Sequence, residues 1–368
     1  SRFRAEDGGG AVRHDHGGNL RALAATAGIP EGQLLDFSAS INPLGLSPRV
    51  EAAIKSAIPR LIHYPDPEAV LLQSALARYH RFSSDCVLVG NGSTELIYLL
   101  ARALAPRRAL ILHPAFSEYE AALELAGCRI ERLILAEAED FLPGLSAFIS
   151  KLAERELVIL ANPGNPTGSL IPIGDLTSLA TAAHEAGAVL VVDEAFVDFV
   201  EEASLKHSFD RFPRLLLLRS LTKFFALPGL RIGYALASPE LLGRLRLWKE
   251  PWSVNGLAEA AGVAALEDRG YQENSRSLIP SWREALVTGL QKFGALQVFP
   301  GAANYLLVKL LDESWNAPTL RTALLRGRIA IRDCSSFPGL GSRFFRVAVR
   351  RPEENQTLLS ALEHFLGL

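Results

Sequence analysis

The stretch AVLVVDEAF at residues 188–196 and the stretch LLLLRSLTKFF at residues 215–225 indicate the fold most directly. In each, an unbroken apolar run ends in charged or hydroxyl side chains. Such runs are typical of strands that are buried on both faces of a sheet. Further apolar runs occur at residues 86–89, 109–112 and 157–160, and helix-like segments at 93–104, 117–126 and 173–186. Strands that alternate with helices predict an α/β fold with a mainly parallel central sheet sandwiched by helices.

The pattern changes beyond residue 265, where long helical periods and short strands replace the regular alternation. The expected helices lie near 271–293 and 353–366, and the expected strands at 304–310, 329–332 and 343–349. The opening residues are rich in glycine and turn signals, and we expect an arm and a loop there. The predicted parts are an N-terminal arm that joins the small domain (1–45), a large α/β domain (46–265) and a small C-terminal α+β domain (266–368).

The overall composition excludes several classes of protein. The 368 residues carry 38 basic and 40 acidic side chains, a formal net charge of −2, with no long run of either sign. Nucleic-acid binding needs a basic surface, so we expect no nucleic-acid partner. The three cysteines form no CxxC pair, which favours reduced thiols and argues against a disulfide framework or a metal site. No membrane-spanning run or secretion signal is visible, which predicts a soluble, cytoplasmic protein without a membrane partner.

Lysine is rare in this chain, with 7 lysines against 31 arginines. Most lysines of a soluble protein are solvated surface charges. Lys223 differs because it follows a predicted strand and precedes Phe224 and Phe225, an apolar setting that disfavours the charged ammonium group. An uncharged amine is a nucleophile that forms Schiff bases with aldehydes. Lys223 is therefore our candidate for covalent chemistry.

Polar side chains follow the other predicted strands, at the sheet edge where parallel α/β folds bind their ligands. Residues 92–94 (Gly92, Ser93 and Thr94) open a helix and can bind an anion through backbone N–H and hydroxyl groups, although an ordinary turn with a Ser cap has the same pattern. Phe116 can stack on a flat ligand or belong to the core. Asn165 lies in a rigid turn that can hold its amide against a ligand, or that is purely structural.

Asp193 is a carboxylate directly after a buried strand, so it needs a positive partner or a protonated nitrogen. A helix cap and a metal ligand are the alternatives, and no cluster of His or Cys residues supports the metal. The whole set of strand-end groups fits pyridoxal 5'-phosphate. Its phosphate would lie on residues 92–94, Ser220, Thr222 and Arg231, its ring between Phe116 and the strand of Asp193, and its aldehyde on Lys223.

Four motifs resemble those of the fold-type-I pyridoxal-phosphate enzymes, in the branch that holds histidinol-phosphate aminotransferase and threonine-phosphate decarboxylase. They are NPGNPTG at 162–168, DEAF at 193–196, SLTK at 220–223 and the segment around Arg231. Other segments look most like the threonine-phosphate decarboxylases, which make aminopropanol phosphate for the cobalamin side chain. These are HGGN at 16–19, DFS at 36–38, INPLG at 41–45, YPD at 64–66, PWSVN at 251–255 and FFRVAVR at 344–350.

The resemblance implies a role for each matching residue. Lys223 would carry the cofactor as a Schiff base, Asp193 would bond the pyridine nitrogen, and Asn165 would bond near the ring hydroxyl. Tyr64 would reach the cofactor phosphate of a neighbouring subunit, which implies a homodimer with shared active sites. The phosphorylated amino-acid substrate would be held by His16, Gly17, Ser40, Asn165, Arg332 and Arg346. The alternative for Arg346 is that it and Arg350 are solvated charges on an edge strand.

Two departures from the family pattern bear on the reaction. Phe196 stands where the transaminases have a Tyr that can bond the ring hydroxyl, and decarboxylases of this branch also tend to have Phe. Ser40 stands where the family commonly has Asn, so its contact to substrate would run through water. We therefore predict pyridoxal-phosphate-dependent decarboxylation of O-phospho-L-threonine to (R)-1-aminopropan-2-yl phosphate.

Three alternatives to this prediction remain. Two are enzymes: an aminotransferase for histidinol phosphate or a related phosphorylated amino acid, and a decarboxylase of O-phosphoserine. The third is a cofactor-binding regulatory module of the kind fused to a DNA-binding domain, which the balanced charge disfavours.

Overall fold

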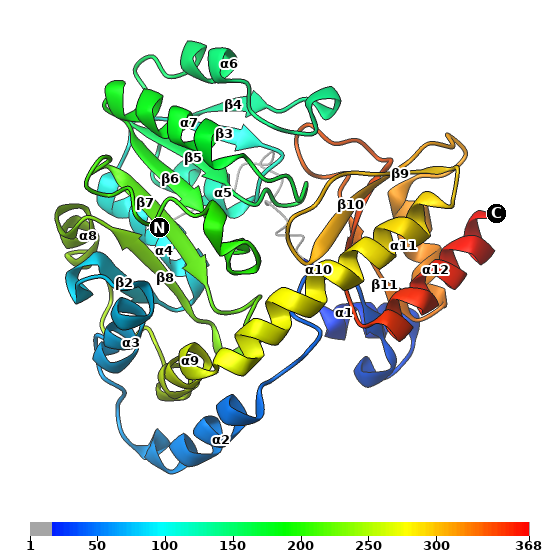
Figure 1. Cartoon of the computed structure of the whole chain (residues 1–368), viewed down its shortest axis with the longest axis horizontal. Coiled ribbons are helices and arrows are strands. Elements are labelled where there is room, and N and C mark those ends of the chain that lie inside the picture. The colour runs from blue at the N-terminus through cyan, green and yellow to red at the C-terminus, as the bar shows by residue number, and fades with distance from the viewer. Residues whose placement is uncertain (1–16, 368) are drawn as a thin grey trace, which may run out of the picture.

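The computed structural model describes residues 17–367 and contains a central sheet of seven strands (Figure 1). In spatial order the strands are β2 (Val87–Gly90), β8 (Gly233–Ala237), β7 (Leu215–Ser220), β6 (Val189–Asp193), β5 (Leu157–Ala161), β3 (Arg108–His113) and β4 (Arg129–Ile134). Strand β8 is antiparallel to both of its neighbours, and the other adjacent pairs are parallel. The predicted α/β fold with a mainly parallel sheet is confirmed.

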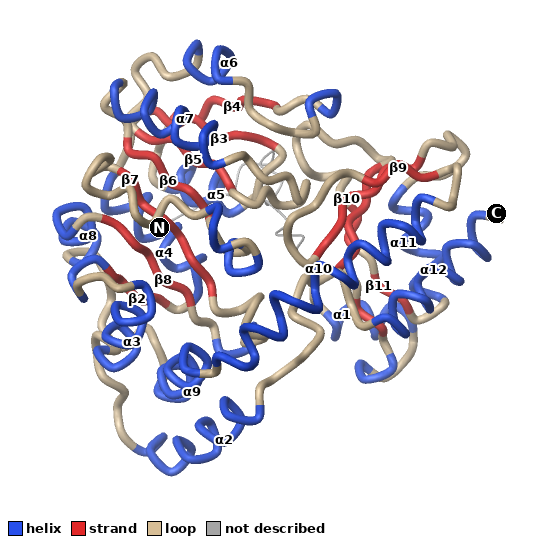
Figure 2. Tube along the Cα trace, viewed as in Figure 1, coloured by secondary structure: helices blue, strands red, loops and turns tan. Residues whose placement is uncertain are grey.

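Both faces of this sheet are covered by helices, as Figure 2 shows with strands in red and helices in blue. Leu215 and Leu217 of β7 pack in the core on one face, whereas Leu216 and Leu218 pack on the other. The first core contains side chains of α3 (Val70–His80), α7 (Ile173–Glu185) and α9 (Gly256–Glu267), and the second those of α4 (Gly92–Leu104), α5 (Glu118–Leu125) and α8 (Pro239–Arg246). Because both faces are buried, polar groups are left to the strand ends.

Two strands of the central sheet are absent from the sequence prediction. Strand β4 lies at the sheet edge, where its charged residues Arg129, Glu131 and Arg132 are partly or fully exposed, so it has no continuous apolar run. Strand β8 is short and begins at Gly233, directly after the Arg231 segment. The predicted helices at 93–104, 117–126, 173–186, 271–293 and 353–366 are confirmed.

A second, four-stranded antiparallel sheet lies in the C-terminal part of the chain. Its strands are, in spatial order, β12 (Arg332–Asp333), β13 (Phe344–Ala348), β10 (Tyr305–Leu310) and β9 (Leu296–Val298). Helices α10 (Arg269–Gln291), α11 (Ala317–Arg326) and α12 (Pro352–Leu366) pack against one face of this sheet (Figure 1). Arg332 and Arg346 are directly opposite each other in the register of β12 and β13.

The described part of the N-terminal segment contacts this C-terminal region. Strand β1 (Leu35–Asp36) pairs in parallel with β11 (Ile329–Ala330), so the strand expected at 329–332 is in fact two short strands. The expected loop before residue 45 is wrong for Leu20–Ala27, which form helix α1 between an Asn19 cap and Gly28 at φ 66°.

Two remaining helices are α2 (Pro48–Ala57) and α6 (Leu145–Ser150). The domain boundaries at residues 45 and 265 stay a prediction. Within residues 17–367, no helix is both long and apolar enough to cross a membrane.

Candidate active site

A cavity of about 540 Å³ opens at the carboxyl ends of the central strands. Groups from the ends of β3, β5, β6 and β7 meet there with groups from the start of α4 and from β12 and β13. The predicted site residues that line it are Gly17, Ser40, Ser93, Thr94, Phe116, Asn165, Asp193, Ser220, Thr222, Lys223, Arg231, Arg332 and Arg346. One cavity therefore collects residues from both ends of the chain.

The start of α4 packs tightly against Arg231 and β8. Gly92 has a φ of 81°, and a Cβ at this position would lie 2.6 Å from Nη2 of Arg231. A Cβ on Gly233 would lie 2.2 Å from the backbone nitrogen of Ser93, so a side chain would displace the helix. Ser93 and Thr94 line the cavity beside Arg231. The site thus combines a helix N-terminus, two hydroxyl groups and a guanidinium group. All of these groups can bind an anion.

The loop after β7 adds two more hydroxyl groups to this anion site. Ser220 Oγ and Thr222 Oγ1 lie 2.6 Å apart in a hydrogen bond that either can donate, and both residues are buried. Each hydroxyl has one hydrogen, so one of the pair keeps a hydrogen for a ligand. Together with the cradle at Gly92 and Gly233, these groups fit a phosphate.

The amine of Lys223 reaches the same cavity, and the residue is partly buried. Burial, followed by the nearby charges of Arg346 and Arg231, lowers the pKa of Lys223 to about 8, and the Asp193 carboxylate acts in the opposite direction. About a tenth of the amine is therefore uncharged at pH 7, far more than for an ordinary lysine, as the sequence context of Lys223 indicates. An uncharged amine in a cavity can attack an aldehyde.

Asp193 ends β6 with its carboxylate buried against the cavity. Its Oδ1 accepts a hydrogen bond of 2.9 Å from the backbone N–H of Ala195, and its Oδ2 accepts one from the hydroxyl of Tyr119. Burial raises the pKa of Asp193, while Tyr119, Ala195 and the charge of Lys223 counteract that effect. The positive partner expected for this carboxylate is supplied at a distance by Lys223, and the direct partners are neutral donors.

The neighbouring residue Glu194 points to the opposite face of the sheet and has a purely internal partner. Its Oε2 lies 2.7 Å from Nε of Arg219, and both side chains are fully buried. Arg219 also contacts Glu201 and Asp198. Burial raises the pKa of Asp198 to about 7. The two adjacent carboxylates at the end of β6 therefore differ in their surroundings: Glu194 belongs to a buried ion-pair cluster, and Asp193 faces the cavity.

Arg346 is buried and reaches across the cavity wall. Its Nη1 donates to Oδ1 of Asn165 and its Nη2 donates to the carbonyl oxygen of Ser38 at 3.0 Å. Its guanidinium also lies 5.1 Å from the ring centre of Tyr305. Among residues 17–367 no carboxylate forms an ion pair with Arg346, so its charge is available to an anion. The alternative of a solvated edge charge does not hold for Arg346.

Three further predicted substrate residues lie close to Arg346. Arg332 is buried, and its guanidinium lies 5.4 Å from the ring centre of Phe337. Ser40 is buried and its Oγ has no hydrogen-bond partner in the described structure, which fits a group that awaits a ligand. A Cβ on Gly17 would lie 2.2 Å from the carbonyl oxygen of Ser38, so only glycine fits there.

Aromatic side chains form the apolar part of the wall. Phe116 is half-buried at the end of β3, with its ring edge-on to Tyr119 at 5.8 Å between centres. Phe196 packs edge-on against Tyr305 at 4.8 Å. The hydroxyl of Tyr305 donates to the carbonyl oxygen of Gly164 at 2.5 Å. Neither Phe196 nor Tyr305 therefore offers a free hydroxyl group, in keeping with the departure from the transaminase pattern.

Two predicted site residues within residues 17–367, Tyr64 and Gly92, are not part of the cavity lining. Tyr64 is 87% exposed and its ring lies 5.6 Å from that of Trp252, outside the cavity. His16 lies outside the described residues. Gly92 lies behind the wall, against Arg231.

Several cavity residues received no role from the sequence, among them Ser38, Tyr98, Glu118, Tyr119 and Phe337. Tyr119 could have been found, because it lies in the first turn of the predicted helix, which begins directly after the strand-end segment that carries Phe116. Ser38 acts through a backbone carbonyl, which the side-chain pattern does not show. Phe337 lies in an irregular segment between β12 and β13, where no periodicity places it.

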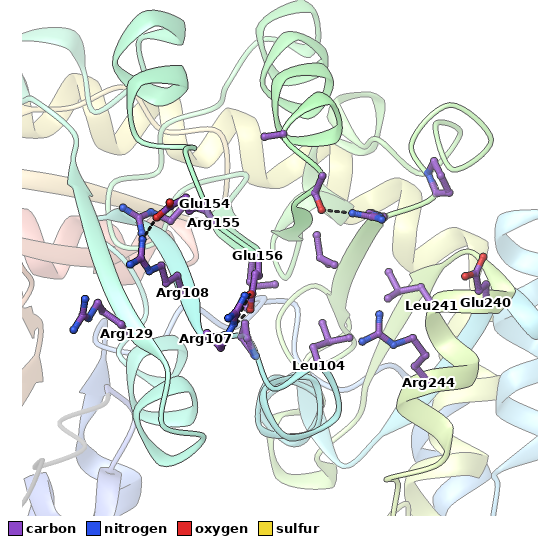
Figure 3. A pocket seen from close by; sticks show the side chains of 17 residues that line it. Leu104, Arg107, Arg108, Arg129, Glu154, Arg155, Glu156, Glu240, Leu241 and Arg244 are labelled. Carbon is purple, nitrogen blue, oxygen red and sulfur yellow. Dashed lines mark hydrogen bonds and ion pairs between the residues drawn. The ribbon is translucent and has the colours of Figure 1, made fainter.

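A larger hollow, of about 1200 Å³, lies at the opposite, amino ends of the central strands (Figure 3). Six arginines line it, together with Glu154, Glu156 and Glu240. Arg107 pairs with Glu156 at 2.8 Å, and Arg108 pairs with Glu154. It holds none of the predicted site residues. Within the described part of the chain, no three His, Cys, Asp or Glu side chains could hold a metal ion.

Comparisons with known proteins agree with this geometry. The family model for aminotransferase class I and II matches residues 32–362. Threonine-phosphate decarboxylase of Salmonella typhimurium is 40% identical over 353 residues, 95% of this chain and 96% of the relative. The L-threonine-O-3-phosphate decarboxylase structure from Porphyromonas gingivalis superposes with a TM-score of 0.82 at 26% identity, over 91% of this chain and 100% of that one.

A solved aminotransferase is also similar. Histidinol-phosphate aminotransferase from Sinorhizobium meliloti, in complex with pyridoxal-5'-phosphate, superposes with a TM-score of 0.87 at 25% identity, over 95% of this chain and 94% of that one. The family match covers most of the chain and includes the strands that build the cavity. The protein therefore belongs to the aminotransferase class I and II family.

Proposed function

We propose that this protein is a pyridoxal-phosphate-dependent decarboxylase that converts O-phospho-L-threonine to (R)-1-aminopropan-2-yl phosphate for the cobalamin side chain. The observation that carries the proposal is that one cavity joins the amine of Lys223, the carboxylate of Asp193 and the unpaired guanidinium of Arg346. The similarity to the Salmonella decarboxylase over nearly the full length of both proteins supports it.

The residues of the cavity fit pyridoxal phosphate. The cradle of Gly92, Ser93 and Thr94 with Arg231 would hold the phosphate, and the hydroxyls of Ser220 and Thr222 would donate to it. Lys223 would attach the aldehyde, and Phe116 would cover one face of the ring. Within residues 17–367, the side chain of Asn165 bonds only through Oδ1, to Arg346, so its Nδ2 would donate to the ring hydroxyl.

When bound, pyridoxal phosphate supplies a conjugated ring that takes up the electron pair left on Cα when a bond to that carbon breaks. Asp193 would hold the proton on the ring nitrogen, since its carboxylate is fixed at the cavity wall. Lys223, freed by the incoming substrate amine, would deliver the proton that Cα needs after carbon dioxide leaves. A pKa of about 8 lets the same amine act as a nucleophile and as a proton donor near neutral pH.

The substrate residues would select the bond that breaks. Decarboxylation requires that the bond from Cα to the carboxylate stand perpendicular to the ring, whereas transamination requires this of the bond to hydrogen. Arg332 and Arg346 lie opposite each other on two strands and offer two buried cations to a substrate with two anionic groups. Ser40 and Gly17 border the same place. These residues would hold the carboxylate out of the ring plane.

An aminotransferase for histidinol phosphate or a related acid is the second candidate, because the Sinorhizobium enzyme shares the fold over nearly the full chain. The lack of a free hydroxyl at Phe196 favours the decarboxylase. Incubating the purified protein with O-phosphothreonine, with and without 2-oxoglutarate, separates the two. We expect carbon dioxide and aminopropanol phosphate in both samples; glutamate without carbon dioxide would overturn the decarboxylase assignment.

We also propose that the protein acts as a cytoplasmic homodimer. Tyr64 packs beside Trp252, with 5.6 Å between ring centres, and both residues, like the nearby Ile62, are more than half exposed in the single chain. Burial of these side chains against a second copy would be favourable. Tyr64 would then reach the partner's cofactor phosphate. All three cysteines are free, which agrees with a reducing compartment. Sedimentation equilibrium tests the dimer, and a monomer at micromolar concentration would contradict it.

A further inference from the structure

Tyr119 is held in place by the apolar core and by one polar contact. It lies in the first turn of α5, is 1% exposed, and packs in the core that also contains side chains of α4 and α8. Its hydroxyl leaves this core and donates to Oδ2 of Asp193. The ring needs only apolar neighbours, so a phenylalanine would fill the same space.

The hydrogen bond from Tyr119 is the second of two that hold the Asp193 carboxylate. Oδ1 accepts from the N–H of Ala195 and Oδ2 accepts from Tyr119. Two donors on two different oxygens fix the rotation of the carboxylate group. Each carboxylate oxygen can accept two hydrogen bonds, so one site per oxygen remains for a ligand in the cavity. Burial raises the pKa of Tyr119 well above its usual value, so the hydroxyl remains a donor.

We propose that Tyr119 is a positioning residue for the cofactor: it aims the Asp193 carboxylate at the protonated ring nitrogen and keeps that carboxylate ionised, so that cofactor affinity depends on the Tyr119 hydroxyl through Asp193 alone. This inference rests on the proposed function. Burial raises the pKa of Asp193, and the hydrogen bond from Tyr119 is the largest of the effects that lower it, so loss of the Tyr119 hydroxyl would raise this pKa further.

The test compares Tyr119→Phe with Tyr234→Phe. Tyr234 is equally buried, lies on the opposite face of the sheet in β8, and hydrogen-bonds His80 at 2.8 Å, so its variant controls for the loss of a buried phenol hydroxyl. Dissociation constants are measured on apoprotein with two probes. One is pyridoxal phosphate, and the other is its 1-deaza analogue, in which a C–H group replaces the ring nitrogen.

For Tyr119→Phe we expect about tenfold to hundredfold weaker binding of pyridoxal phosphate, the usual effect of losing a hydrogen bond to a buried charged group. Binding of the deaza analogue should change by less than about twofold, because this probe has no ring proton for Asp193 to bind. Tyr234→Phe should bind both probes like the parent. In an Asp193→Asn background, Tyr119→Phe should add less than about twofold.

Three results would overturn the inference: unchanged affinity for pyridoxal phosphate in Tyr119→Phe, equal losses for both probes, or the same loss in the Asp193→Asn background. A parent protein that binds neither probe would instead contradict the proposed function itself. The two failures are therefore distinguishable.

Discussion

A hollow lies at each end of the strands of the central sheet, and the two hollows differ in whether their arginines are paired with carboxylates. The amino-end hollow is the larger, at about 1200 Å³ against 540 Å³, and has six arginines. Its arginines are largely paired: Arg107 with Glu156, Arg108 with Glu154, and Arg155 with Glu131, while Arg214 donates to the carbonyl of Gly187. In the carboxyl-end cavity Arg346 is buried and has no carboxylate partner among residues 17–367.

The difference shows that volume and arginine content do not mark the site. An exposed arginine beside a glutamate is already neutralised and screened by water, and such a pair contributes about 0–1 kcal/mol. A buried cation without a counter-ion is costly unless an anion arrives. The carboxyl-end cavity also contains an amine with a lowered pKa and a buried Ser40 hydroxyl that has no partner in the part of the chain that the structure describes. Perturbed and unsatisfied groups in one place are the signature of a functional site.

The sharpest contrast between the two ends is expected for Lys223→Ala. Turnover should fall by about a thousandfold or more, because the nucleophile and the proton donor are lost together. The visible absorbance of bound cofactor should also change at equal cofactor load. The matched control is Lys151→Ala, whose ammonium pairs with Glu131 near the amino end and is 42% exposed. A Lys223→Ala protein with the parent's spectrum and turnover would contradict the assignment.

Replacing a cation of the carboxyl-end cavity should have the next largest effect. For Arg332→Gln we expect kcat/KM for the phosphorylated substrate to fall about a hundredfold, from the loss of about 3 kcal/mol of charged hydrogen bonding. Cofactor retention should hardly change. Arg343→Gln is the control, because Arg343 is a partly exposed residue that pairs with Glu313. Equal losses of substrate and cofactor binding would indicate that Arg332 is only structural.

The lowered pKa of Lys223 predicts a pH dependence. The rate at which apoprotein forms a Schiff base with pyridoxal phosphate should rise about tenfold per pH unit below pH 8 and level off above it, because only the deprotonated amine reacts. Stopped-flow absorbance measures this rate. A midpoint near 10.5, the ordinary value for lysine, would mean that the cavity does not desolvate the amine.

Substitutions in the amino-end hollow are expected to have almost no effect on activity or stability. Arg107→Gln and Arg244→Gln should leave kcat/KM within about twofold of the parent, and the free energy of unfolding within about 1 kcal/mol, since both lie on the exposed rim of that hollow. Steady-state kinetics and denaturant unfolding measure the two quantities. A tenfold loss of activity in either variant would remove the distinction between the two hollows.

The sequence predicts most of the carboxyl-end cavity because its residues directly follow apolar runs that are local in the chain. Asp193 ends a strand, and Lys223, Asn165 and Phe116 each follow a strand by a few residues; parallel strands bring such ends together. Arg332 and Arg346 came instead from the family resemblance, since their pairing depends on the register of two short strands. The role of each residue stays a prediction until a variant is measured.

Other features depend on contacts that no local pattern encodes. The bond from Tyr119 to Asp193 joins residues 74 positions apart, and the buried pair of Glu194 and Arg219 is visible only once the sheet is assembled. Strand β4 lies at the exposed edge of the sheet, where charged residues interrupt the apolar run, so its sequence has no pattern typical of a buried strand. Tyr64 lies outside the cavity of its own chain, so its predicted role requires a second subunit.

The most direct test of the account is to locate the lysine that carries the cofactor. Holoenzyme is reduced with borohydride, which converts the Schiff base to a stable secondary amine, then digested and mapped by mass spectrometry. The account predicts one phosphopyridoxyl group per chain, on the peptide that contains Lys223. A label on any of the other six lysines, or no label at full cofactor occupancy, would contradict it.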